Sequence, residues 1–372
     1  MVFVFFTHSL VSDWNHGNAH FLRGVATELI CRGHEVRVFE PANGWSRQQL
    51  LADAGPGAIA RFRSTFPALR SHAVDLETLS IDRALDRADV VVVHEWNPHS
   101  VVARIGRHRA RGGRYALLFH DTHHRSVTNI SAMAAYDLDG YDGVLAFGDV
   151  IRQRYLSFGW ARRAWTWHEA ADTRLFKPAS DMQPDKDLIW IGNWGDDERS
   201  AEIQAYLIEP ARDLRLRATI HGVRYPESAL RLLREAGVRH EGWLANYDAP
   251  LAYAQHRMTV HIPRRPYVLS LPGIPTIRVF EALACGVPLV STPWHDAEQL
   301  FTPGEDYLVA GDPSQMRAHL AALCADDDLR RSLIEHGLAT IRRRHTCAHR
   351  VDELMAIVRQ VRGTAIEEAV SA

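Results

Sequence analysis

One stretch of the sequence places a proline, a threonine, an arginine and a glutamate at the start of an otherwise apolar helix. This stretch is Leu269–Ser291, "LSLPGIPTIRVFEALACGVPLVS". A proline fits the first turn of a helix, and the amides beside it lack partners within the helix. An arginine at the same place can donate two parallel hydrogen bonds to an anion. A glutamate one turn later can accept hydrogen bonds from ribose hydroxyls. Five residues are therefore predicted to contact a nucleoside diphosphate: Pro275, Thr276, Ile277, Arg278 and Glu281.

Other loops in the second half of the chain combine glycine with basic residues after a predicted strand. In Trp190–Arg199, the last residue lies in the first turn of a helix, where the helix dipole disfavours a cation. Arg199 therefore needs an anionic partner, which is Asp196, Asp197 or a bound phosphate. The further residues predicted to contact the same ligand are Asn193, Arg199, His221, Gly222 and Arg264.

Two loops in the first half carry histidines and aspartates after a predicted strand. Thr7–His20 opens a helix, and Gly17 lets its backbone approach a ligand, although Asn18 could simply cap that helix. The dinucleotide fingerprint G-x-G-x-x-G is absent from this loop. His120–Arg125 could bind a metal, but it could equally hydrogen-bond a sugar or a diphosphate. The candidates for catalysis in these loops are Asp13, His16, His120 and Asp121.

Neither a metal nor a cofactor is predicted. Asp137 and Asp139 form a D-x-D pair that could hold a divalent cation on a nucleotide sugar. Their segment, "YDLDGYDGVLAFG", is explained more simply as a solvated turn before a strand. The four cysteines are scattered along the chain, which indicates neither a zinc site nor a disulfide framework.

The composition is that of a protein with two domains and no general affinity for polyanions. At 372 residues the chain exceeds the roughly 250 to 300 residues at which single cores stop growing. A net charge of -2 gives no general attraction to nucleic acid or to anionic membranes. Of the 43 lysine and arginine residues only Lys177 and Lys186 are lysine, so arginines, amides and helix ends must recognise anions.

Short apolar runs alternate with amphipathic helical patterns in two series. The expected strands are Val2–Phe6, Glu35–Phe39, Val90–His94, Tyr115–His120, Val144–Phe147, Leu188–Ile191, Arg217–His221, Met258–Ile262 and Pro288–Ser291. Helices are expected at Ala19–Arg32, Ala201–Arg212, Ile274–Cys285, Gln315–Ala325, Asp328–Arg343 and Arg350–Val361. This alternation predicts an α/β protein with two parallel, doubly wound sheets. The proline-containing polar segment Thr173–Asp187 interrupts it and is predicted to be the interdomain linker.

The chain resembles the group-1 superfamily of GT-B glycosyltransferases, particularly its spore-maturation-protein-like branch. The resemblance covers nearly the whole chain and rests on Gly17, "LICRGHEVRVFEP" at Leu29–Pro41, "ADTRLFKP" at Ala171–Pro178 and "FEALACGVPLVSTP" at Phe280–Pro293. It implies two Rossmann-like domains that face each other across a cleft. The expected parts are an acceptor domain at 1–172, a linker at 173–187, a donor domain at 188–345, and a helix at 346–372 that packs back on the first domain.

The same resemblance assigns roles to two residues and reveals departures from the family pattern. Glu281 is expected to hold the donor ribose, and His120 to contact the transferred sugar or its phosphate. The superfamily often has a second glutamate eight residues before Glu281, and here that position is Gly273. The lysine that usually accompanies the diphosphate arginine is also absent, which leaves Arg199 and Arg278 as substitutes. His16 stands where the first glycine of a pair is usual.

The resemblance implies a metal-independent enzyme that transfers a sugar from a nucleotide-diphosphate donor with retention. A UDP-sugar is favoured over a GDP- or dTDP-sugar. Inversion would need a base, for which Asp13, His16 and Asp121 are all available. The alternatives are a nucleotide-sugar 2-epimerase of the same fold and a non-catalytic nucleotide-binding module. A sugar phosphorylase is disfavoured because it needs a Schiff-base lysine and both lysines lie near the linker.

The acceptor is expected to be a small molecule, a glycan or a lipid-linked compound, and nucleic acid is not an expected partner. No run of about 18 apolar residues occurs, and Met1–Phe6 is too short for a signal sequence, so a cytoplasmic location is expected. Peripheral contact with a membrane and the oligomeric state are left open. Because the predicted residues are split between two domains, we expect the cleft to close on the donor, with the linker and the terminal helix as hinges.

Overall fold

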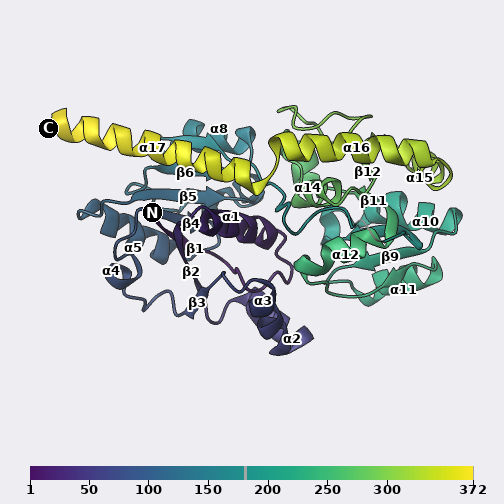
Figure 1. The fold of residues 1–372 in the computed structure, drawn as a ribbon, viewed down its shortest axis with the longest axis horizontal. Coiled ribbons are helices and arrows are strands. Elements are labelled where there is room, and N and C mark those ends of the chain that lie inside the picture. Colours follow the sequence, from purple (N-terminus) through teal and green to yellow (C-terminus); the bar gives the residue numbers. More distant parts are fainter. Residues whose placement is uncertain (180–181, 372) are drawn as a thin grey trace. The chain divides into compact units, whose positions relative to one another are not determined.

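The chain divides into two compact units in the computed structural model, which describes residues 1–179 and 182–371 (Figure 1). Unit 1 contains Met1–Glu169 and the C-terminal segment from Cys347 onward, and unit 2 contains Ala170–Thr346. Unit 2 begins before the linker expected at 173–187, because Ala171 is tied to that unit through a hydrogen bond from its amide to the His345 carbonyl at 3.0 Å. Residues 180 and 181 of the expected linker lie outside the described residues.

Unit 1 is built on a parallel sheet with the strand order β3-β2-β1-β4-β5-β6-β7. Its strands are β1 (Val2–Phe6), β2 (Glu35–Pro41), β3 (Ser71–Val74), β4 (Val90–His94), β5 (Ala116–Asp121), β6 (Gly143–Ala146) and β7 (Ala164–Thr166). The strand order reverses direction between β1 and β4, which pair directly. Ligands of doubly wound sheets bind outside the carboxyl ends of the strands at such a reversal. The loops after β1 and β4 are therefore the expected site loops of this unit.

The helices of unit 1 connect these strands. They are α1 (Ala19–Cys31), α2 (Trp45–Ala54), α3 (Gly57–Thr65), α4 (Ile81–Ala84), α5 (His99–Ala110), α6 (Arg125–Thr128), α7 (Ile130–Ala134), α8 (Asp149–Ser157) and α17 (Cys347–Ser371). The strands β4 and β5 are buried along their whole length, as the continuous apolar runs predict for a covered parallel sheet. The short edge strands β3 and β7 were not predicted, because their few residues are not fully buried and carry no apolar pattern.

Unit 2 repeats the architecture with the strand order β10-β9-β8-β11-β12-β13, again parallel. Its strands are β8 (Lys186–Ile191), β9 (Ala218–His221), β10 (Arg239–His240), β11 (His256–His261), β12 (Leu289–Ser291) and β13 (Leu308–Val309). The order reverses between β8 and β11, so the loops that follow these two strands lie at the topological switch point. The edge strands β10 and β13 are two residues long and escaped prediction.

The helical segments of unit 2 include one departure from the sequence pattern. They are η1 (Asp196–Glu198), α9 (Ser200–Ile203), η2 (Gln204–Ile208), α10 (Glu209–Asp213), α11 (Glu227–Glu235), η3 (Asn246–Asp248), α12 (Ala249–Ala254), α13 (Arg265–Ser270), α14 (Ile277–Ala284), α15 (Pro313–Ala325) and α16 (Asp327–Arg344). The single helix predicted at Ala201–Arg212 contains a π-helical turn, η2, ahead of Pro210. The apolar faces of this segment, α11 and α15 enclose the core around Leu188 and Met258.

The last helix, α17, returns to unit 1 and packs against α1. Val351 and Leu354 on its inner face are fully buried. The Trp167 indole donates to the Arg350 carbonyl at 2.8 Å, and the Arg350 guanidinium is itself buried. Within the described residues no helix is long and apolar enough to cross a membrane.

Truncation of Leu354 should therefore destabilise unit 1 rather than unit 2. We expect Leu354→Ala to lower the free energy of unfolding of unit 1 by about 2–5 kcal/mol, because it leaves a cavity at a fully buried position. Calorimetry can assign the transitions, since Ile203→Ala truncates the core of unit 2. The exposed Arg359→Ala on the same helix is the control and should change stability by less than about 0.5 kcal/mol. If Leu354→Ala instead lowered the melting temperature of the transition that Ile203→Ala identifies as that of unit 2, the placement of α17 in unit 1 would be contradicted.

Candidate active site

Two arginines of unit 2 meet at one asparagine where the strand order reverses. Arg199 donates to the side-chain oxygen of Asn193 at 2.7 Å and to its carbonyl at 2.8 Å. Arg264 donates to the same side-chain oxygen at 2.9 Å and forms an ion pair with Glu198. Asn193 follows β8 and Arg264 follows β11, the two strands at the switch point. The topology thus brings together residues that are 71 positions apart in the sequence.

Arg199 has different partners from those that the sequence suggested. Asp196 pairs with Arg224 at 2.9 Å instead. Besides Asn193, Arg199 donates to the Ile262 carbonyl at 3.1 Å, and its guanidinium lies 5.1 Å from the centre of a tryptophan ring. Burial, followed by the charge of Arg264, lowers the pKa of Arg199 to about 9. Its Nε has no hydrogen-bond acceptor among the described residues, so this cation retains capacity for an anion.

Two glycines are required for this arrangement. A Cβ at Gly195, where φ is 84°, would lie 2.5 Å from the Arg199 side chain. A Cβ at Gly222 would lie 1.9 Å from the Gly192 carbonyl oxygen. Gly222 follows His221, whose pKa burial lowers to about 4, so that imidazole is neutral near pH 7. Gly222 therefore allows the loops after β8 and β9 to approach each other, and Gly195 leaves room for the Arg199 side chain within the first of them.

The helix α14 presents its first amides without a side-chain cap. The sequence placed Pro275 in the first turn, but the helix begins at Ile277, with Thr276 as the N-cap and the proline just outside. The Thr276 hydroxyl lies 3.2 Å from the ring of His261, and burial lowers the pKa of that histidine to about 3. As the structure describes it, the Thr276 side chain makes no capping hydrogen bond. The N-cap side chain thus does not compete with an anion for the leading amides of α14.

Glu281 is fully buried one turn into α14, where polar side chains hold its carboxylate. The Asn246 amide donates to one of its oxygens at 2.7 Å, and Arg278 forms an ion pair with the other. The two residues that were predicted to hold the ribose and the diphosphate are therefore paired with each other. A donor would engage both by rearranging the exposed part of the Arg278 side chain.

The position of the missing second glutamate is occupied by a neighbouring carboxylate. Gly273 has φ of 87°, and its amide donates to the His295 carbonyl at 2.6 Å. A Cβ at this position would lie 2.8 Å from Oε1 of Glu298. Glu298 thus places an acidic group where the side chain of residue 273 would begin.

The loop after β1 in unit 1 is shaped by two buried charges. Glu40, at the end of β2, accepts hydrogen bonds from the Leu10 amide at 2.7 Å and the Val11 amide at 3.3 Å. Arg23, on α1, donates to the carbonyls of the same two residues and forms a 2.8 Å ion pair with Asp13. Asp13 was a candidate base, and it serves here as the counterion of a buried guanidinium.

The predicted histidines form part of a row of rings. His16 packs edge-on against His8 and His94, with ring centroids 5.1 and 6.3 Å apart, and His94 packs in the same way against His120 at 5.3 Å. Burial lowers the pKa of His16 well below its usual value and that of His120 to about 3. Both nitrogens of His120 lack partners within the described part of the chain. The row is therefore neutral near pH 7, and its nitrogens that lack partners in the described structure are buried.

Asp121 belongs to a buried pair of carboxyl groups that the sequence did not reveal. Burial raises the pKa of Asp121 to about 6, and burial together with the Asp121 charge raises that of Glu95 well above its usual value. The Tyr155 hydroxyl donates to Asp121 at 2.9 Å, and the Thr122 amide donates to Glu95 at 3.0 Å. Arg125 lies 3.7 Å from Glu95. The pair joins the loops after β4 and β5.

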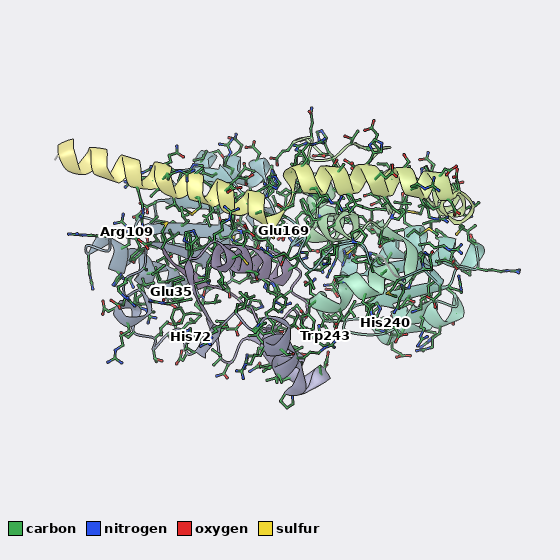
Figure 2. The ribbon with its side chains drawn as sticks, viewed as in Figure 1. Glu35, His72, Arg109, Glu169, His240 and Trp243 are labelled. Carbon is green, nitrogen blue, oxygen red and sulfur yellow. The ribbon has the colours of Figure 1, made fainter. Side chains whose placement is uncertain are left out.

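The remaining first-half candidates have local roles. Asn18 precedes α1, but its amide donates to Glu169 at 2.8 Å instead of capping the helix; Figure 2 labels the glutamate. Gly17 accepts a hydrogen bond from the His20 amide at 3.3 Å. Asp137 accepts one from the amide of residue 139, which confirms the predicted solvated turn. Among the described residues, no group of three or more histidine, cysteine or acidic side chains could hold a metal ion.

Sequence reasoning missed several residues that complete these arrangements. Glu95 directly follows the run "VVVVH", and its position after a buried strand was the available signal. His94, the last residue of that run, was counted as strand only. Glu298 lies in a loop and Asn246 begins the short helix η3, and neither stands in a recognisable pattern, so only the fold brings them beside Gly273 and Glu281.

Comparison with known proteins identifies the fold and one domain. Residues 199–356 match the family model described as glycosyl transferase-like. Among curated proteins, none matches the chain by sequence. Sucrose-phosphate synthase from Thermosynechococcus elongatus is 12% identical, with a TM-score of 0.66 over 98% of this chain and 100% of that chain. A glycosyltransferase from Rickettsia africae is also 12% identical, with a TM-score of 0.66 over 97% of this chain and 98% of that chain.

A third similar structure is Anabaena HepE, which was solved in complex with UDP-glucose. It is 14% identical, with a TM-score of 0.65 over 96% of this chain and 99% of that chain. The chain therefore has the GT-B fold, and residues 199–356 are similar to the glycosyl transferase-like family, as the resemblance to GT-B glycosyltransferases implied. The matched region includes the residues from Arg199 through Glu281.

The buried carboxyl pair should make stability depend on pH in a defined direction. Because both pKa values are raised, the native state binds more protons than the unfolded chain between about pH 4 and 6, and stability contributed by the pair is lost as pH rises. Glu95→Gln removes one acid but keeps an acceptor for the Thr122 amide. Relative to wild type, its free energy of unfolding should rise by about 1 kcal/mol or more between pH 4.5 and 7.5. Denaturant titrations at both pH values measure this difference.

The exposed Glu235→Gln serves as the control and should follow the wild type at both pH values. Parallel behaviour of Glu95→Gln and wild type would show that the two carboxyl groups do not share a proton.

Proposed function

We propose that the chain is a glycosyltransferase that moves a sugar from a UDP-sugar to an acceptor without a metal ion. The observation that carries the proposal is the convergence of Arg199, Arg264 and the start of α14 in one unit. Charge develops on the departing diphosphate, and preorganised cations and amides at that point lower the barrier. UDP is preferred over GDP and dTDP because HepE, which is similar in structure, forms complexes with UDP and UDP-glucose.

The donor residues divide into those for the diphosphate and those for the nucleoside. Arg199 and Arg264 supply charge that a divalent cation would otherwise provide, and the amides of Ile277 and Arg278 add donors. Glu281 accepts from the ribose hydroxyls, with Asn246 holding its second oxygen in place. In this proposal Arg278 turns from Glu281 toward the diphosphate when the donor enters.

We further propose that the transfer retains the configuration of the sugar. A general base works best when its pKa lies near the operating pH, and burial moves the pKa values of His16 and His120 well below that range. Asp13 is held by Arg23. The pKa of Asp121, about 6, lies nearer that range, but its carboxyl group is fully buried and already accepts a hydrogen bond from Tyr155. In the retaining reaction the acceptor oxygen bonds to the anomeric carbon, the carbon–diphosphate bond breaks, and the diphosphate takes the hydroxyl proton.

Loss of one donor arginine should reduce turnover strongly. We expect Arg199→Ala and Arg278→Ala each to lower the rate of UDP release by about 10²-fold, the usual loss for one electrostatic group in the transition state. The donor is first chosen by thermal shift with UDP-, GDP- and dTDP-sugars, because a ligand at about 100 times its Kd adds roughly 2.7 kcal/mol. UDP release is then measured with a panel of sugars and lipid-linked glycans as acceptors.

The exposed Arg231→Ala on α11 is the matched control and should turn over at the wild-type rate. Wild-type rates in both Arg199→Ala and Arg278→Ala would refute the proposed donor site. Conversion of the UDP-sugar to its epimer without an acceptor would identify an epimerase instead.

The stereochemical proposal has its own measurement. Proton NMR of the first product formed should show the same anomeric configuration as the sugar in the donor. An inverted product that disappears in Asp13→Asn, His16→Gln or Asp121→Asn would show that one of these residues acts as a base after all.

A further inference from the structure

A pocket in unit 1 gathers basic side chains that the donor site does not use. It has a volume of about 550 Å³, and we refer to it as the α3 pocket. Its polar lining consists chiefly of Glu40, Arg47, Arg63, Arg70 and His72. Figure 2 labels His72, which lies on the edge strand β3. Val11, from the loop that also carries His8 and His16, lines the pocket as well.

The charges around the α3 pocket are unbalanced. Its one lining carboxylate, Glu40, commits an oxygen to the amides of the loop after β1 and lies 3.6 Å from Arg47. Arg63 and Arg70 are exposed and have no carboxylate at ion-pair distance among the described residues. Arg47 lies in the first turn of α2, where the helix dipole disfavours a cation. The pocket therefore has more positive charge than the protein itself neutralises.

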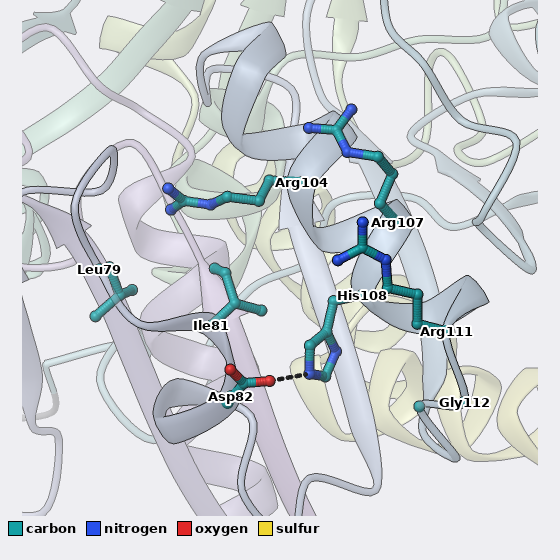
Figure 3. Close-up of a pocket in the computed structure, with 9 residues that line it drawn as sticks. Leu79, Ile81, Asp82, Arg104, Arg107, His108, Arg111 and Gly112 are labelled. Atoms are coloured by element: carbon teal, nitrogen blue, oxygen red, sulfur yellow. Dashed lines mark ion pairs between the residues drawn. The ribbon is translucent and has the colours of Figure 1, made fainter.

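A second basic pocket shows what an ordinary arginine-rich surface looks like in this chain. Figure 3 shows Arg104, Arg107, His108 and Arg111 beside Asp82, in a recess of about 540 Å³. Arg107 and His108 lie in the last turn of α5 and Arg111 directly follows it, where cations complement the helix dipole. Arg104, in the middle of the helix, donates to the carbonyls of Leu76 and Glu77. His108 also pairs with Asp82 at 3.2 Å. That pocket needs no ligand to explain its charges.

The α3 pocket differs because its basic residues come from separate elements. Arg47 lies on α2, Arg63 on α3, and Arg70 and His72 at the start of β3. Guanidinium groups that reach one recess from several directions suit the several oxygens of a phosphate group, to which each can donate two hydrogen bonds. A recess can also enclose a small soluble ligand, whereas it would make little contact with a flat membrane surface.

We propose that the α3 pocket binds the phosphate group of a water-soluble phosphorylated compound, and that this compound is the acceptor. The second clause rests on the proposed glycosyltransferase function. Its basis is position: the pocket adjoins the carboxyl ends of β1 and β2, and Glu40 lines it while holding the loop with His16. Arg63 and Arg70 bind the phosphate, and the sugar hydroxyls of the compound extend toward that loop.

Binding of glucose 6-phosphate, compared with glucose, tests the pocket directly. The full chain is first saturated with UDP, so that the arginines of unit 2 are occupied, and binding is followed by calorimetry. The wild type should prefer the phosphate ester by about tenfold or more, since each charge-assisted hydrogen bond is worth roughly a decade of affinity. The double variant Arg63→Gln/Arg70→Gln should lose that preference and keep the wild-type melting temperature, because both side chains are exposed.

The matched control is Arg107→Gln/Arg111→Gln, which removes the same charge from the pocket in Figure 3 and should bind as the wild type does. Equal losses in both double variants would indicate a general charge effect and overturn the proposal. So would an unchanged preference in Arg63→Gln/Arg70→Gln or no preference in the wild type. Cosedimentation with phosphatidylglycerol vesicles distinguishes the source of the phosphate, because binding that depends on Arg63 and Arg70 would point to a lipid headgroup instead.

The binding measurement does not require sugar transfer. A chain that binds glucose 6-phosphate through Arg63 and Arg70 but transfers no sugar would uphold the phosphate site and refute only its role as an acceptor site. Transfer to uncharged acceptors alone, unaffected by Arg63→Gln/Arg70→Gln, would uphold the enzyme and refute the acceptor class.

Discussion

The repulsion between guanidinium groups is the constraint around which unit 2 is organised. Arg199 and Arg264 share one asparagine oxygen, and the charge of Arg264 contributes to the lowered pKa of Arg199. Such an arrangement is unfavourable unless each cation has hydrogen-bond acceptors or a counterion. Asn193 and Glu198 meet this need without neutralising the whole cluster. The unit therefore keeps excess positive charge in one place, and a bound diphosphate could neutralise it.

In unit 1 the buried charges stabilise backbone instead, because the loop after β1 has few backbone–backbone hydrogen bonds of its own. Glu40 accepts hydrogen bonds from amides of the loop after β1, and Arg23 donates to its carbonyls. These two charged side chains thus provide the hydrogen bonds that secondary structure provides elsewhere. Both side chains are almost completely buried. Removing either would leave buried backbone groups without partners, which costs more than the hydrogen bond itself contributes. An acidic side chain at Asp13 is explained by this structure, because it is the counterion of the buried Arg23.

The sequence was sufficient to predict the two sheets, because fully buried parallel strands such as β4 are recognisable apolar runs. It also placed Arg199, Arg278 and Glu281 in one unit, since each follows a strand or opens a helix. Partners were harder to predict. Arg199 bonds to Asn193 rather than to Asp196, because the orientation of a loop depends on contacts such as the one between Gly192 and Gly222. Asp121 was a candidate, but its pairing with Glu95 was missed because Glu95 follows β4 and Asp121 ends β5, and only the sheet brings the two together.

The contact between Gly273 and Glu298 limits how this sequence can change. A glutamate at position 273 would adopt a positive φ of 87° and begin 2.8 Å from the existing carboxylate. Backbone strain and like charge would both oppose that single substitution. Replacement of Glu298 by a smaller residue removes the obstacle, but until the second change occurs it leaves neither acid in place. In the present backbone, a glutamate at position 273 and the observed position of the Glu298 side chain therefore exclude each other, so introducing the first requires a change at the second.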